Sequence, residues 1–273
     1  MTRRPFLLLT GIPRSGTTLT ASLINMLEDT ICLHEPSQFR CFCKESRDEA
    51  DFAGRCLAEL KELRASLLNG GTVTDGRTSD GSYPTNYFDE SGSRVGLIPV
   101  PSRLPNPGPH SLLAVKHNEV FTSILPKLLR FEELKVVVVI RHPVPTMLSW
   151  QSRTIPLSSG QLAAAYRYWD EALRIRDAGG DVRDVQAKIY ELYCARYWEH
   201  RDRITILRYE DIVERPGVLE EATGRRFVEG ADLSAQSMNH ARRTEEHNVE
   251  EMKIVMSKYF KTVYEFYPDL SKW

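Results

Sequence analysis

Short apolar runs alternate along the chain with longer stretches in which apolar residues recur at helical spacing. One run, Val136–Ile140, is apolar at every position, which is typical of a strand buried on both faces of a parallel sheet. The pattern predicts strands at Phe6–Leu9, Ile31–Leu33, Leu112–Val115, Lys135–Ile140 and Ile204–Leu207. We therefore expect an α/β fold: a single domain of three layers, α/β/α, around a mostly parallel central sheet.

The segments between these strands, and the end of the chain, show the helical spacing. It predicts helices at Thr17–Leu27, Lys44–Leu68, Phe121–Leu129, Val144–Arg153, Gly160–Arg176, Val182–His200 and Glu251–Phe266. Sheets of this kind bind ligands at the carboxyl ends of their strands. The turns after Leu9, Ile140 and Leu207 are therefore the first places to look for a site.

Residues 69–110 break the alternation. The segment is dense in Gly, Pro, Ser, Asp and Asn, has no hydrophobic period and is longer than an ordinary connection. We interpret it as an insertion within the single domain of residues 1–273, either a lid over a ligand site or a disordered loop.

Composition narrows the possible functions. The formal net charge of −1 gives no overall field that would attract nucleic acid or an anionic membrane. The apolar runs are too short to span a bilayer. We expect a soluble cytoplasmic protein with neither nucleic-acid nor membrane partners; a homodimer remains open.

Cysteine usage fits the same compartment. The chain has five cysteines, an odd number, which favours reduced thiols over a disulfide framework. Cys41, Cys43 and Cys56 could contribute to a zinc site, but Cys41 and Cys43 lack a matching second pair. We predict no metal.

The turn after the first strand has the spacing of a phosphate-binding loop. Gly11–Thr18 lies between a predicted strand and a predicted helix, where backbone N–H groups can cradle a phosphate. Its glycines follow G-x-x-x-x-G, but Thr17 stands where nucleotide-hydrolysing loops have lysine, and Arg14 supplies the cation. The strand ending at Ile140 offers no acid for Mg²⁺. Both departures disfavour a user of ATP or GTP.

Three motifs resemble those of sulfotransferases that use 3′-phosphoadenosine-5′-phosphosulfate (PAPS). Pro13–Leu19, with the sequence PRSGTTL, resembles the family's P-loop-like phosphosulfate-binding loop, particularly in the protein-tyrosine branch and bacterial relatives. Arg141, with Ser149 eight positions later, is similar to the 3′-phosphate motif. Arg208–Asp211, with the sequence RYED, resembles a third family segment. The motifs occur in the family's order.

The resemblance implies a PAPS site with two anionic ends, each needing its own cations. The implied cofactor-binding residues are Arg14, Ser15, Gly16, Thr17, Thr18, Arg141, Ser149, Arg153, Tyr209 and Arg242. Three of these have open alternatives. Arg153, four residues after Ser149 on the predicted helix, could be an ordinary solvated cation. Tyr209 could be a core residue, and Arg242 lies in a segment, 237–243, whose register the motifs do not fix.

Catalysis of sulfuryl transfer needs a base for the acceptor and a cation for the leaving oxygen. Glu35, after the second strand, matches the base of the protein-tyrosine branch. His117 is the competing base, because the small-molecule branch uses a His close behind a Lys. Lys116 resembles the cation that stabilises the transition state. We expect His34 to be a bystander, since strand alternation turns it away from Glu35.

The leading hypothesis is a sulfotransferase that moves the sulfuryl group of PAPS, in line and without a metal, to a hydroxyl or amine of a small-molecule or saccharide acceptor. Residues 69–110, with their aromatic residues Tyr83, Tyr87 and Phe88, would cover the acceptor site. Three alternatives stay open: tyrosine sulfation of a peptide or protein, a P-loop small-molecule kinase, and a non-catalytic nucleotide-binding protein.

Overall fold

The computed structural model describes residues 4–86, 88, 93, 95–104, 106–152, 155–161, 164–233 and 246–272. Five strands form the central sheet in the order β2-β5-β1-β6-β7, and each neighbouring pair is parallel. They are β1 (Phe6–Gly11), β2 (Thr30–His34), β5 (Leu112–Lys116), β6 (Leu134–Ile140) and β7 (Thr205–Arg208). The predicted parallel sheet is confirmed, strand by strand.

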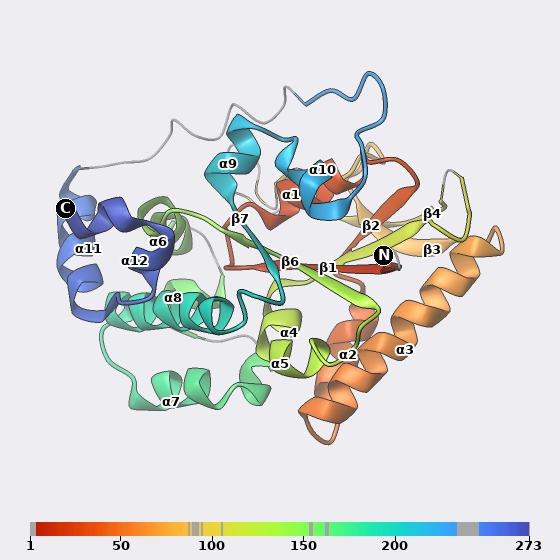
Figure 1. The fold of residues 1–273 in the computed structure, drawn as a ribbon. Coiled ribbons are helices and arrows are strands. Elements are labelled where there is room, and N and C mark those ends of the chain that lie inside the picture. Colours follow the sequence, from red (N-terminus) through yellow and green to blue (C-terminus); the bar gives the residue numbers. More distant parts are fainter. Residues whose placement is uncertain are drawn as a thin grey trace.

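Helices cover both faces of this sheet (Figure 1). The α-helices are α1 (Thr17–Ile24), α2 (Ser37–Glu45), α3 (Glu49–Leu68), α4 (Asn118–Ser123), α5 (Leu125–Leu128), α6 (Pro143–Gln151), α7 (Asp170–Ala178), α8 (Val182–Glu199), α9 (Tyr209–Glu214), α10 (Val218–Thr223), α11 (Glu246–Tyr259) and α12 (Val263–Phe266). The described residues also form the 3₁₀ helices η1 (Pro156–Ser159), η2 (Ala164–Tyr168) and η4 (Pro268–Lys272).

Alternation along the strands divides the core between the two faces. Successive strand residues point to opposite sides, so Phe6 and Leu8 of β1 enter one buried cluster whereas Leu7 and Leu9 enter the other. The first cluster is covered by helices that include α2–α6, α8 and α11, and the second by α1, α9 and α10. The predicted α/β/α layering is therefore confirmed.

Four helix predictions had the wrong extent. The helix predicted at Phe121–Leu129 falls into α4 and α5, and the helix predicted at Glu251–Phe266 falls into α11 and α12. The expected helix at Gly160–Arg176 starts only at Asp170, because Gly160 adopts a φ of 71° and the chain then forms η2. The expected helix at Lys44–Leu68 is two helices: Asp48 is extended and its side chain accepts hydrogen bonds from the amides of Ala50 and Asp51, which starts α3 afresh.

Residues 69–110 contain regular structure that the sequence pattern did not predict. Strands β3 (Val73–Arg77) and β4 (Ile98–Ser102) pair as an antiparallel two-stranded sheet. The sequence pattern did not predict β4, because Pro99 and Pro101 lie within it and proline disfavours the assignment of a strand. Two residues apart, they remove N–H groups on the same side only, so the other side can still pair.

Two features are absent from the described residues. None of the helices there combines the length and the apolarity that crossing a membrane requires. The same part of the chain contains no group of three or more His, Cys, Asp or Glu side chains arranged to hold a metal ion.

Candidate active site

The strand order places the carboxyl ends of four strands, each followed by polar residues, side by side at one end of the sheet. Because β2, β5, β1 and β6 are parallel neighbours, their carboxyl ends lie side by side. His34 is level with Lys116 in the register, and Lys116 with Leu9, just before the glycine-rich turn. Glu35, Lys116, the 11–18 turn and Arg141 thus surround one edge of the sheet.

The glycine-rich turn has a conformation that depends on its own residues. Gly16 has a φ of 93°, and a Cβ placed on it would lie 2.2 Å from Cδ2 of Tyr209. Arg14 adopts a positive φ of 71°, which costs a non-glycine residue about 1–2 kcal/mol. The Ser15 hydroxyl donates to the Val139 carbonyl over 2.8 Å. Ser15 therefore fixes the turn to β6 and does not point into open space.

Direct contacts join this turn to α6, the helix that follows Arg141. Nε of Arg14 donates to Oγ of Ser149 over 3.1 Å, and Nε1 of Trp150 donates to the Pro13 carbonyl over 2.7 Å. Trp150 is fully buried. The two segments that resemble separate phosphate motifs are thus one connected unit.

Residues of the 69–110 segment reach the same turn. Nη2 of Arg14 donates to Oδ1 of Asn86 over 3.2 Å, and the guanidinium lies 4.8 Å from the ring centroid of Phe88. This part of the insertion therefore covers the arginine of the turn.

Arg141 leaves β6 beside Tyr209. Its guanidinium lies 4.6 Å from the centroid of the Tyr209 ring, and this ring also lies against Gly16. Nε of Arg141 is buried and has no hydrogen-bond partner among the described residues. Tyr209 is 3% exposed and belongs to a core cluster. Tyr209 is therefore a core residue, and its contact with a nucleoside stays a prediction.

Glu210 of the RYED segment fixes the backbone next to Arg141. One carboxylate oxygen accepts the His142 amide over 2.9 Å, and the other accepts the Tyr267 hydroxyl over 3.1 Å. The Arg141 carbonyl accepts the hydroxyl of Tyr190. The turn that carries Arg141 is therefore held from β7–α9, from α8 and from the C-terminal region.

Glu35 lies at the end of β2 in a strained conformation. Its φ is 49°, and its amide donates to the Lys116 carbonyl over 3.0 Å. One carboxylate oxygen pairs with Nζ of Lys116, which is 1% exposed, and the other lies 2.5 Å from Nη2 of Arg40. Burial acts to raise the pKa of the Glu35 carboxyl, but the charge of Lys116 and its hydrogen bond, together with His117 and His34, hold this pKa well below the usual range.

His117 is buried beside this pair. Both ring nitrogens lack a hydrogen-bond partner among the described residues, and Nδ1 is 3.9 Å from a carboxylate oxygen of Glu119. Burial lowers the pKa of His117 to about 4, so the ring is neutral at pH 7. Burial, with the charge of Lys116, lowers the pKa of His34 to about 3.

Some site features fall outside what the sequence predicted or what the structure describes. Arg153 and Arg242 lie outside the described residues. The sequence analysis did not identify Arg40, although it lies in the first turn of α2, five residues after Glu35. Asn86 was missed because nothing in a Gly- and Pro-rich segment shows which residue folds back onto the turn. The pairing of Trp150 with Pro13 joins positions 137 residues apart.

A cavity of about 580 Å³ lies away from this edge. Arg4, Pro5 and Leu134 line it, at the start of β1 and of β6, together with Arg203 and Asp202. It is therefore at the amino ends of the strands and contains none of the residues described above.

Comparisons with known proteins agree with the sequence motifs. The sequence model of the sulfotransferase family matches residues 5–222, well over half of the chain. Among solved structures, the chain is similar to a sulfotransferase from Alicyclobacillus acidocaldarius (15% identity, 97% of this chain and 96% of that chain covered, TM-score 0.44) and to sulfotransferase STF1 from Mycobacterium tuberculosis H37Rv (13% identity, 94% and 77% covered, TM-score 0.42). No curated protein matches it. On the strength of the family match, the chain belongs to the sulfotransferase family.

Proposed function

We propose that this sulfotransferase uses PAPS as donor and a hydroxyl or amine of a small-molecule or saccharide acceptor. The observation that carries the proposal is the hydrogen bond between Arg14 and Ser149, because it joins a phosphate-binding turn to the helix that follows Arg141. A donor with two separate anionic groups needs two such places next to each other.

The residues present suit this donor. The buried Nε of Arg141 lacks a partner among the described residues, and a buried donor without an acceptor is costly unless a ligand supplies one. Gly16 lets the turn pack against Tyr209, because any side chain at this position would collide with the Tyr209 ring. The proposed cofactor contacts are Arg14, Ser15, Gly16, Thr17 and Thr18 for the phosphosulfate, Arg141 and Ser149 for the 3′-phosphate, and Arg153, Tyr209 and Arg242 as further contacts.

Within this set, the side chain of Ser15 is already hydrogen-bonded to the protein. Its hydroxyl donates to the Val139 carbonyl and is fully buried, so we propose that Ser15 acts through its backbone amide.

Bound PAPS would supply a sulfuryl group activated by a phosphate leaving group. Glu35 is the proposed base: its low pKa keeps the carboxylate ionised, so it can accept the acceptor's proton. Lys116 is the proposed cation: its ammonium group pairs with Glu35, and its positive charge would stabilise the negative charge that develops on a departing oxygen. The pairing with Lys116 contributes to this low pKa, so any weakening of the pairing would raise the pKa and make proton transfer to Glu35 easier.

His117 remains the alternative base. Its neutral ring and its two nitrogens without partners in the described part of the chain suit proton abstraction. Glu35 is favoured because its side chain is 10% exposed whereas that of His117 is 2% exposed, so an acceptor reaches the carboxylate more easily.

The test is transfer of ³⁵S from labelled PAPS to three acceptor types, p-nitrophenol, N-acetylglucosamine and a tyrosine-containing peptide, with EDTA present. Label on the phenol or the sugar, with release of the desulfated product PAP, supports the proposal. Label on the peptide alone would favour tyrosine sulfation. Binding of PAP without turnover would favour a non-catalytic protein. Phosphate transfer from Mg²⁺–ATP with no ³⁵S transfer would favour the kinase.

A further inference from the structure

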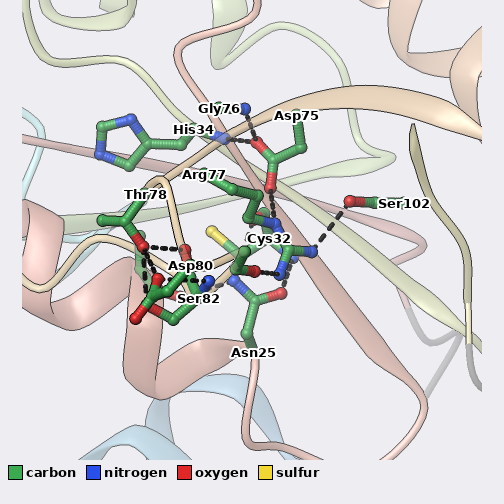
Figure 2. A network of polar contacts seen from close by, with 12 residues as sticks. Asn25, Cys32, His34, Asp75, Gly76, Arg77, Thr78, Asp80, Ser82 and Ser102 are labelled. Atoms are coloured by element: carbon green, nitrogen blue, oxygen red, sulfur yellow. Dashed lines mark hydrogen bonds and ion pairs between the residues drawn. The ribbon is translucent and has the colours of Figure 1, made fainter. Parts of the chain in front are cut away.

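The outer edge of β2 is protected by side chains where a further strand would otherwise pair. β2 is an edge strand, with β5 on one side only. On the other side, the amide of Cys32 donates to Oδ1 of Asn25 over 2.8 Å and the amide of His34 donates to Oδ1 of Asp75 over 2.8 Å. Two side chains thus accept the outward N–H groups of this strand (Figure 2).

Asp75 is a buried carboxylate of the β3–β4 hairpin, and its own surroundings hold it in place. Its side chain is 0% exposed, and Oδ1 also accepts the Gly76 amide over 3.0 Å. Oδ2 lies 3.3 Å from Nε of Arg77, whose Nη2 donates to Oγ of Ser102 over 2.8 Å on β4. Arg77 also stacks on Tyr83, at 3.4 Å from the ring centroid. Figure 2 shows the carboxylate of Asp75 between the His34 amide and Arg77.

The amide that Asp75 holds is next to the strained residue. Glu35 follows His34 directly and adopts a φ of 49°, a conformation that a non-glycine residue keeps only when its surroundings enforce it. Two hydrogen bonds do so from opposite sides: the His34 amide is bound outward to Asp75, and the Glu35 amide inward to the Lys116 carbonyl. The kink between them directs the Glu35 side chain toward Lys116.

We infer that Asp75 is a positioning residue for the proposed base Glu35: it fixes the backbone kink at the end of β2 from the hairpin of the 69–110 segment. The inference rests on the proposed function, and it gives this segment a second task besides covering the site. Asn25 provides a matched comparison, because it accepts an amide of the same strand two residues earlier, and its side-chain hydrogen bonds go to Ala21 and Cys32.

The experiment compares Asp75→Ala, Asp75→Asn and Asn25→Ala with wild type in the full chain, measuring PAPS cleavage, PAP affinity and amide exchange of His34 by NMR. Asp75→Ala should slow kcat about 10- to 100-fold, keep the Kd for PAP within about twofold and speed exchange of the His34 amide at least tenfold. Asp75→Asn keeps an oxygen for the amide and should stay within about threefold of the wild-type kcat. Asn25→Ala should lower the Tm and leave kcat unchanged.

Wild-type kcat in Asp75→Ala, or an Asp75→Asn variant as slow as Asp75→Ala with the His34 amide still protected, would overturn the positioning role. If Asp75→Ala does not fold, hydrogen exchange in the wild type still tests the inference, because rapid exchange of the His34 amide there would overturn it. Failure of the wild type to bind PAP is a different result: it would contradict the proposed donor, while slow exchange at His34 would still support the structural hold on Glu35.

Discussion

The two halves of the site are built in different ways. The half proposed to bind phosphate comes from two strand–turn–helix units, β1–α1 and β6–α6, in which the turn follows its strand directly and the neighbouring strands set its place. The half that holds Glu35 combines the end of β2, the end of β5 and a hairpin about 40 residues further along. The two turns of the proposed anion site therefore form locally and are then joined by tertiary contacts, whereas placement of the proposed base itself depends on tertiary contacts.

The largest effect should come from replacing the base. Glu35→Gln removes the proton acceptor at nearly constant shape, so kcat should fall by about 10²- to 10⁴-fold while PAP affinity changes little. Steady-state kinetics and PAP titration measure the two quantities. Glu45→Gln, an exposed carboxylate on α2, is the control and should retain full activity. A kcat within threefold of wild type would transfer the role of base to His117.

Gly16→Val tests the local character of the phosphate turn. The φ of 93° and the approach to Tyr209 should together cost about 2–4 kcal/mol of the free energy of unfolding and abolish PAP binding. Urea denaturation and calorimetry provide the measurements. Gly54→Ala is the control, because a Cβ on this exposed position of α3 meets no atom within 4 Å, and it should stabilise the protein by about 0.5–1 kcal/mol. A stable Gly16→Val protein that binds PAP would contradict the account.

His117→Leu tests burial beside the base through the pH dependence of stability. An unfolded histidine titrates near 6.5, whereas burial lowers the pKa of folded His117 to about 4, so the unfolded chain binds more protons between these values. The contribution of neutral His117 is complete above about pH 6.5 and is lost as the pH falls toward 4. Wild type should lose about 2 kcal/mol from this residue between pH 7 and pH 5. Urea unfolding at both pH values should show that the free energy of unfolding changes less with pH in His117→Leu than in wild type. An equal change in the two proteins would contradict the burial of His117.

Ser149→Ala should have the smallest effect. It removes the acceptor for Nε of Arg14, so stability should fall by about 0.5–1.5 kcal/mol and PAP affinity by about tenfold or less. Thermal unfolding and PAP titration would measure both. Ser152→Ala, one residue past the end of α6, should change PAP affinity by less than twofold. If the two variants lost PAP affinity equally, Ser149 would not be a cofactor-binding residue.

The same division explains what the sequence could predict. The five strands and the glycine-rich turn were predictable, because a fully apolar run such as Val136–Ile140 and a G-x-x-x-x-G turn carry their signal within a few residues. The β3–β4 hairpin was not, because Pro99 and Pro101 conceal it. Nor were the contacts of Asp75 with His34 or of Trp150 with Pro13, since each depends on the folded arrangement of distant segments.

Arg141 and the 11–18 turn are proposed to form one site for a donor with two anionic ends. The most direct test of this proposal is the thermal stabilisation of the purified protein by PAP, compared with Mg²⁺–ATP, in wild type and Arg141→Ala. PAP at a hundredfold excess over its Kd should stabilise the wild type by about 2.7 kcal/mol, and Arg141→Ala should lose most of this effect. Stabilisation by Mg²⁺–ATP and not by PAP would contradict the account.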